Sequence, residues 1–109
     1  MSEEANEALA RLDHHIAELQ QALADLDWQR LAELNGDLHP LVDPVMTALE
    51  SRQLSATAVQ QRLGELDDFV NRADDAAHKA RREAREALDQ VGQNRKAASA
   101  YARVSKRDK

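Results

Sequence analysis

The residues of this chain that could do chemistry are four histidines and several neighbouring carboxylates. His14 and His15 are adjacent, so on a helix their side chains point about 100° apart and cannot chelate one metal ion together. His78 follows Asp74 by four residues, which places two ligands on one helix face. Two such ligands, without a thiolate or a further histidine, make a poor zinc site. The sequence therefore predicts solvated surface histidines and no metal.

Enzymatic activity is not expected either. The pairs Asp67-Asp68 and Asp74-Asp75 lie in helical sequence, where neighbouring carboxylates usually face water. No glycine-rich phosphate loop and no nucleophile beside a base is visible. The chain has no cysteine, which excludes thiol catalysis, thiolate metal sites and disulfides. We expect no catalytic residue and no cofactor.

Charge and composition narrow the class of partner. The 109 residues carry a net charge of −5 and only three aromatic side chains. Nucleic acid is therefore a poor partner, since it requires a basic surface and aromatic stacking platforms. Residues 1–54 carry a net charge of −8 and residues 55–109 carry +3. Either the two halves pack together with complementary charge, or the basic side chains of residues 55–109 form a surface for an acidic partner.

The membrane is not an expected location. No apolar run approaches the roughly 20 residues that a membrane span requires. The acidic segment MSEEANEA is unlike a signal or transit peptide. We expect no membrane insertion.

Apolar residues recur at intervals of three and four over most of the chain, the pattern of amphipathic helices. The first predicted helix runs over about residues 3–26. The second segment, residues 28–53, keeps this spacing but contains Gly36, Pro40 and Pro44, each four residues after the one before. It is predicted to be a helix that is kinked or locally broken between Gly36 and Pro44. Alternatively, Asp43 and Pro44 could cap and begin a new helix.

The third segment begins with a capping signal and continues as the longest apolar stripe. Ser55 is the expected N-cap, and Leu54 and Val59 form a hydrophobic staple around it. Gly92 is expected to end this helix, as a glycine just past a helix end commonly does. The stripe consists of Val59, Leu63, Leu66, Val70, Ala73, Ala77, Ala80, Ala84, Ala87 and Val91.

These elements predict an all-α fold in two parts. Residues 1–91 are expected to form an antiparallel up-down-up helical bundle with a long third helix. Residues 92–109 are expected to form a short, basic C-terminal helix or tail. The predicted core comprises Leu12, Ile16, Leu19, Leu31, Leu38, Val45, Leu63, Leu66 and Val70.

The far part of the third helix is the predicted partner-binding surface. This helix is longer than the first two, so beyond about Ala84 it has no neighbour within the predicted bundle. Small side chains there leave a shallow groove that a partner helix can fill. Close packing inside the bundle, or pairing with a second copy in a homodimer, would also explain the alanines. The expected contact residues are Ala77, Ala80, Ala84, Ala87, Leu88 and Val91.

The residues after Gly92 are predicted to form a reversible cover for that surface. On a short helix, Ala98, Tyr101 and Val104 share one side. A helix of this length is marginal by itself in water, so it needs a surface to pack on. Docking is expected to be weak, because few large apolar groups anchor it.

Three segments together resemble one known family. They are "LDWQRLAEL" at the start of the second helix, "DDAAHKARREAREALDQV" on the third, and "GQNRKAASAY" after it. With the chain length, they resemble the FliT family of flagellar type III export chaperones. Pro40, Pro44 and the high alanine content depart from the family pattern.

The resemblance implies a cytoplasmic, non-enzymatic helical chaperone. Such a chaperone binds the filament cap protein FliD before export and delivers it to the export apparatus, while its last helix regulates access. Some members of the family also bind the flagellar master transcription regulator. The alternative, from a different class, is a self-associating structural coiled coil with no export client.

Overall fold

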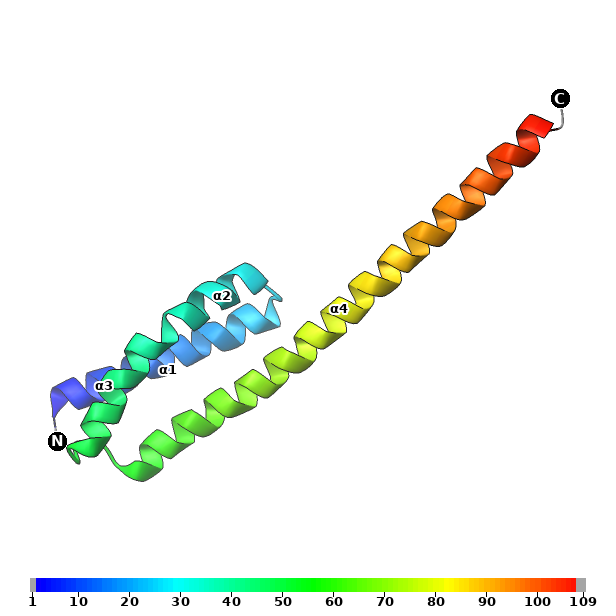
Figure 1. The fold of residues 1–109 in the computed structure, drawn as a ribbon. Helices are drawn as coiled ribbons and strands as arrows, with labels where there is room; N and C mark the ends of the chain where they lie inside the picture. Colours follow the sequence, from blue (N-terminus) through cyan, green and yellow to red (C-terminus); the bar gives the residue numbers. More distant parts are fainter. Residues whose placement is uncertain (1, 108–109) are drawn as a thin grey trace. The chain divides into compact units, whose positions relative to one another are not determined.

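The computed structural model describes the backbone of residues 2–107 and the side chains of residues 2–103. The predicted all-α class is confirmed, because helices cover nearly all of the described chain and no strand occurs in it. The helices are α1 (Glu3–Ala24), α2 (Trp28–Gly36), α3 (Leu38–Glu50) and α4 (Ala56–Arg107) (Figure 1). The chain divides into two compact units, which we call unit 1 (Met1–Ala73) and unit 2 (Asp74–Lys109).

Short polar residues fix where three of the helices begin. Ser2 precedes α1, Asp27 precedes α2 and Ser55 precedes α4. Each side chain accepts a hydrogen bond from the backbone N–H three residues later, at 3.1–3.4 Å. These bonds satisfy N–H groups that have no partner within the helix. Leu26 and Arg52 adopt positive φ of 54° and 61°, in the turns after α1 and α3.

The second helical segment is broken at Asp37, between α2 and α3. The ring of Pro40 would clash with the carbonyl group of Gly36, four residues before it, in a continuous helix. Within α3, Pro40 lies in the first turn, where its missing N–H removes no helical hydrogen bond. Pro44 lies inside α3, so no new helix begins there.

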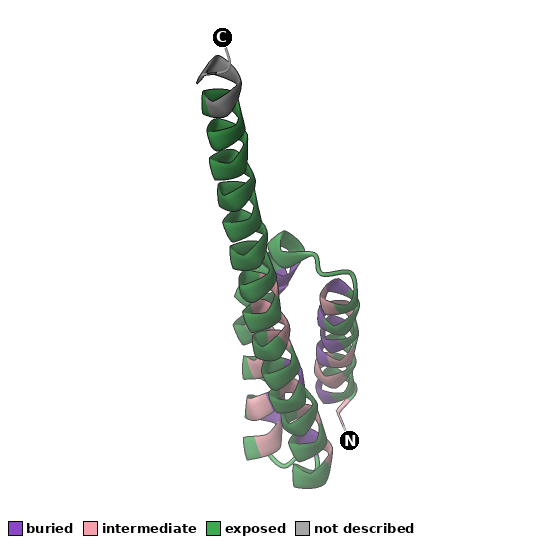
Figure 2. Cartoon of the chain, turned by 90° about the vertical axis from the view of Figure 1, so that its right-hand side faces the viewer, coloured by how far each residue is buried: buried purple, intermediate pink, exposed green. Residues whose placement is uncertain are grey.

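Two apolar clusters form the core of unit 1, on the inward faces of its helices (Figure 2, purple). The first joins the start of α1, the end of α3 and the start of α4: Ala5, Leu12, Ile16, Val45, Ala48, Leu54 and Val59. The second joins the end of α1 to α2 and to Phe69 of α4: Leu19, Ala22, Leu31, Leu34 and Phe69. Leu38 and Leu66 pack against both clusters.

The predicted core is correct for Leu12, Ile16, Leu19, Leu31 and Val45, whereas Leu38 and Leu66 are only half-buried and two further residues of α4 are exposed. Leu63 and Val70 are 42% and 58% exposed, although both were expected inside. Phe69 is buried in their place, at 7% exposure. Burying the phenyl ring removes more apolar surface from water than burying a valine, which favours turning this side of the helix inward.

The helix end expected at Gly92, and with it a separate helix over residues 92–109, is not found. α4 continues through Gly92 to Arg107. No described glycine has a positive φ, so Gly92 does not adopt the left-handed conformation that ends helices. A glycine inside a helix costs about 1 kcal/mol relative to alanine, and strong helix formers on both sides compensate for a cost of that size.

Candidate protein-binding surface

Unit 2 is a single helical segment whose described side chains are mostly exposed. Every described side chain from residue 81 to residue 103 is exposed (Figure 2, green). Ala77 and Ala80 are half-buried, whereas Ala84, Ala87, Leu88 and Val91 are exposed. All six residues predicted to bind a partner therefore lie on this segment, and four of them are open to solvent.

The continuity of α4 extends the predicted stripe past Gly92. Alternating steps of three and four residues continue from Val91 to Asn94, Ala98 and Tyr101. We call the eight positions of this stripe in unit 2 the seam: Ala77, Ala80, Ala84, Ala87, Val91, Asn94, Ala98 and Tyr101. At 1.5 Å per residue the seam is about 36 Å long. Val91 and Tyr101 are 47% and 79% exposed.

The predicted tail residues do not cover the predicted binding surface. Tyr101 follows Leu88 by 13 residues in the same helix, which separates them by about 20 Å along its axis. They could approach only if the helix broke between them, for example near Gly92. Ala98 and Tyr101 instead lengthen the apolar face. The backbone of Val104 belongs to α4, but its side chain lies outside the described residues.

Charge is distributed differently in the two units. Unit 1 contains 14 acidic and five basic side chains, a net charge of −9, and unit 2 contains six acidic and ten basic ones, a net charge of +4. Away from the seam, a shallow hollow of about 380 Å³ is lined by Arg95, Lys96, Ser99, Ala100 and Arg103. Unit 2 therefore has one apolar face and a basic patch at Arg95, Lys96 and Arg103, whereas Asp74 and Asp75 make its beginning acidic.

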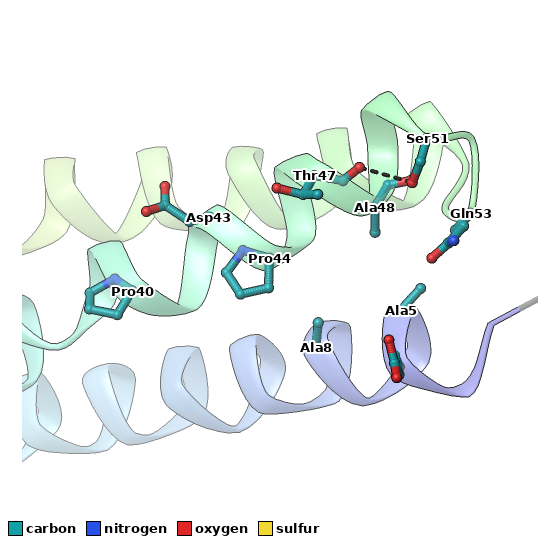
Figure 3. Close-up of a pocket in the computed structure, with 10 residues that line it drawn as sticks. Ala5, Ala8, Pro40, Asp43, Pro44, Thr47, Ala48, Ser51 and Gln53 are labelled. Carbon is teal, nitrogen blue, oxygen red and sulfur yellow. Dashed lines mark hydrogen bonds between the residues drawn. The ribbon is translucent and has the colours of Figure 1, made fainter.

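A groove that the sequence reasoning missed lies in unit 1, between α1 and α3 (Figure 3). Ala5 and Ala8 of α1 face Pro40, Pro44 and Ala48 of α3, and these small side chains leave a space of about 700 Å³. Its other lining residues are polar: Glu4, Asp43, Thr47, Ser51 and Gln53. The spacing of small residues was visible in the sequence, but the pairing of these two helices was not.

His15 is buried, which corrects the expectation that every histidine is solvated. The residue is 7% exposed, and Nε2 lies 2.6 Å from the backbone oxygen of Leu34. A carbonyl oxygen only accepts, so Nε2 carries the hydrogen and donates it. Leu34 is close to the end of α2, and its carbonyl oxygen also accepts from the backbone N–H of Asp37 at 3.2 Å, so His15 uses the second lone pair of that oxygen. The histidine thus ties α1 to the helix break, while His14 remains exposed beside Glu18.

A second polar contact ties α1 to α4 within unit 1. Arg62 donates from Nε to Oδ1 of Asp13 at 3.0 Å and from Nη2 to Oδ2 at 3.2 Å. It also donates from Nη1 to the backbone oxygen of Ala58 at 3.0 Å. The hydrogen bond with Asp13 raises the pKa of Arg62 above its ordinary value. Arg62 and Phe69 are seven residues apart and share one side of α4, so this pair and the buried phenyl ring both hold that side toward the core of unit 1.

In comparisons with known proteins, no family model, no curated protein and no solved structure matches this chain. The resemblance to the FliT family therefore stays a prediction from the sequence. Among the described residues, no three His, Asp or Glu side chains come together as metal ligands. None of the described helices is both long and apolar enough to cross a membrane.

Proposed function

We propose that the chain is a binding protein without enzymatic activity, which holds an amphipathic helix of a client along the seam. The exposed seam is the observation that carries this proposal, since seven of its eight positions are apolar or aromatic. Long exposed apolar faces are typical of interaction sites, and helices commonly bind to such faces. The alanines allow the backbone of a client helix to approach closely, while Val91 and Tyr101 provide most of the apolar area.

In this proposal unit 1 is an antiparallel up-down-up bundle that anchors the start of α4. Support comes from the first core cluster, which contains the start of α1, the end of α3 and the start of α4 together. The contacts of His15 with Leu34 and of Arg62 with Asp13 add polar specificity to that packing. The bundle is then the stable part of the protein and unit 2 is the part that meets the client.

The resemblance to the FliT family identifies the proposed client as the filament cap protein FliD. The chain would bind it in the cytoplasm before type III export and deliver it to the export apparatus. The flagellar master transcription regulator is a further partner that the resemblance suggests. The basis for these names is the three similar sequence segments, to which the exposed seam adds a place for the client.

Calorimetric titration of the purified full chain with purified FliD tests the proposal. Ala84→Glu places a carboxylate in the seam, and we expect it to weaken binding at least tenfold, because an unpaired buried charge is costly. Ala100→Glu is the matched control on another face of the same helix, and it should bind as the wild type does. Equal binding by both variants would show that the client does not bind along the seam. Absence of binding by the wild type would refute the FliD assignment.

Truncation after Gly92 tests the role of the tail residues. If Ala98 and Tyr101 extend the client surface, as their place in the seam favours, the shortened chain binds more weakly. If they act as the cover that the sequence predicts, it binds more tightly, by about tenfold if the uncovered form is about 10% populated. Tyr101→Ala should change the affinity for the client in the same direction as the truncation, but by a smaller factor.

A further inference from the structure

The seam has the heptad spacing of a coiled coil. Its residues fill the a and d positions of four successive heptads, with a at Ala77, Ala84, Val91 and Ala98, and d at Ala80, Ala87, Asn94 and Tyr101. Leu88, which is 72% exposed, lies at a flanking position beside the seam. Continuous helix through Gly92 is what joins the last two heptads to the first two, so this repeat depends on the observed backbone.

We infer that the seam pairs with the seam of a second copy of this chain, as an antiparallel coiled coil. The inference does not depend on the proposed client, which would have to displace the second copy in order to bind the same seam. Shape supports one alignment, in which Ala84 lies opposite Ala87 of the second copy. Val91 then lies opposite Ala80 and Asn94 opposite Ala77, so both of these side chains meet an alanine on the other helix. Ala98 and Tyr101 extend past the seam of the second copy and lie opposite its Ala73 and Val70, and Val70 is 58% exposed.

Charge complementarity supports the antiparallel direction. Asp74 and Arg95 occupy equivalent flanking positions of the heptad, three heptads apart. In the alignment above, Asp74 of each copy lies beside Arg95 of the other, and the two-fold symmetry forms this pair twice. The carboxylate of Asp74 also pairs with His78 at 3.4 Å, but its side chain is 68% exposed and remains accessible.

A parallel pair is disfavoured by the same charges. It would place Asp74 level with Asp74 and Arg95 level with Arg95. It would also bring together the two copies of residue 73, and with them two units that each carry a net charge of −9. Repulsion between such units opposes association unless salt screens it.

Sedimentation equilibrium of the full chain over a broad concentration range tests the inference. The wild type should change from the 12.2 kDa chain mass to twice that mass as concentration rises. The alanines bury little area, so we expect a micromolar dissociation constant rather than a nanomolar one. Val91→Glu should weaken dimerisation at least tenfold, and Gln93→Glu, on another face of the helix, should leave it unchanged. Circular dichroism establishes that both variants remain helical.

Charge exchange tests the direction. Asp74→Arg and Arg95→Asp should each weaken dimerisation roughly threefold, and the double variant should restore it, because the pair reforms between copies. A wild type that stays monomeric throughout, or a Val91→Glu variant that dimerises normally, would overturn self-association through the seam. Failure of the double variant to recover would overturn the antiparallel alignment. No client is present in these measurements, so their outcome is separate from that of the proposed function.

Discussion

Unit 1 and unit 2 share helix α4, but the helix meets different surroundings in each. In unit 1, Val59 and Phe69 of α4 are 1% and 7% exposed. In unit 2, Leu88 and Tyr101 of the same helix are 72% and 79% exposed. Tertiary packing therefore stabilises the helix in unit 1, whereas in unit 2 it relies on helix propensity and on ion pairs four residues apart. The same helix thus contributes core residues in unit 1 and an open apolar face in unit 2.

A buried and an exposed leucine should separate the two units most clearly. Leu12 is 1% exposed, so Leu12→Ala should lower the free energy of unfolding by about 2–5 kcal/mol, through lost burial and the cavity left behind. Leu88→Ala is the matched change in unit 2 and should alter it by less than about 0.5 kcal/mol. Urea unfolding followed by circular dichroism measures both. A large loss with Leu88→Ala would mean that the flank of the seam around Leu88 is already covered within the free protein.

The adjacent histidines provide the next largest contrast, this time within unit 1. His15→Ala removes the hydrogen-bond donor to the Leu34 carbonyl and leaves a space in the core, so it should cost about 1–3 kcal/mol. His14→Ala removes an exposed ring that contacts only Glu18 and should cost less than about 0.5 kcal/mol. Equal effects of the two changes in urea unfolding would contradict the burial of His15.

The sequence predicted the features of the fold that local signals determine. Ser55 could be identified as a cap, and the prolines indicated a disturbed second segment, because capping and proline geometry depend on only a few neighbouring residues. Which side of α4 faces inward depends on other helices. Leu63 and Val70 fit an apolar stripe as well as Phe69 does, so spacing alone could not choose between them.

The apolar stripe of the candidate site could be followed in the sequence as far as Val91 and not beyond it. A glycine fits both a helix end and a helix interior, and treating Gly92 as an end separated Tyr101 from the stripe that it continues. His15 was missed for a different reason, because its carbonyl partner becomes available only where α2 ends, 19 residues later in the sequence. Such partners require the three-dimensional pairing of α1 with α2.

The ion pair between α1 and α4 should show a smaller effect. A double-mutant cycle on Asp13 and Arg62, with alanine at each site, should give a coupling energy of about 1 kcal/mol, because the pair is bidentate but partly solvated. The matched pair is Glu7 and Arg11, 3.9 Å apart and well exposed, whose coupling should be close to zero. Similar couplings in both cycles would show that Asp13 and Arg62 do not hold α4 in place.

The two glycines of α4 give the smallest effect and the sharpest comparison of the units. Gly64 lies in unit 1 and Gly92 in unit 2; both are helical, and a methyl group added to either meets open space. Alanine at each should therefore favour the helix by about 0.4–1 kcal/mol. Gly64→Ala should raise the free energy of global unfolding by that amount, because the part of α4 around Gly64 packs in the core of unit 1. Gly92→Ala should leave global unfolding unchanged and slow hydrogen exchange only at neighbouring amides, since unit 2 can open locally. Faster exchange around residue 92 in Gly92→Ala would instead indicate the helix end that the sequence predicts, because alanine tolerates a left-handed backbone poorly.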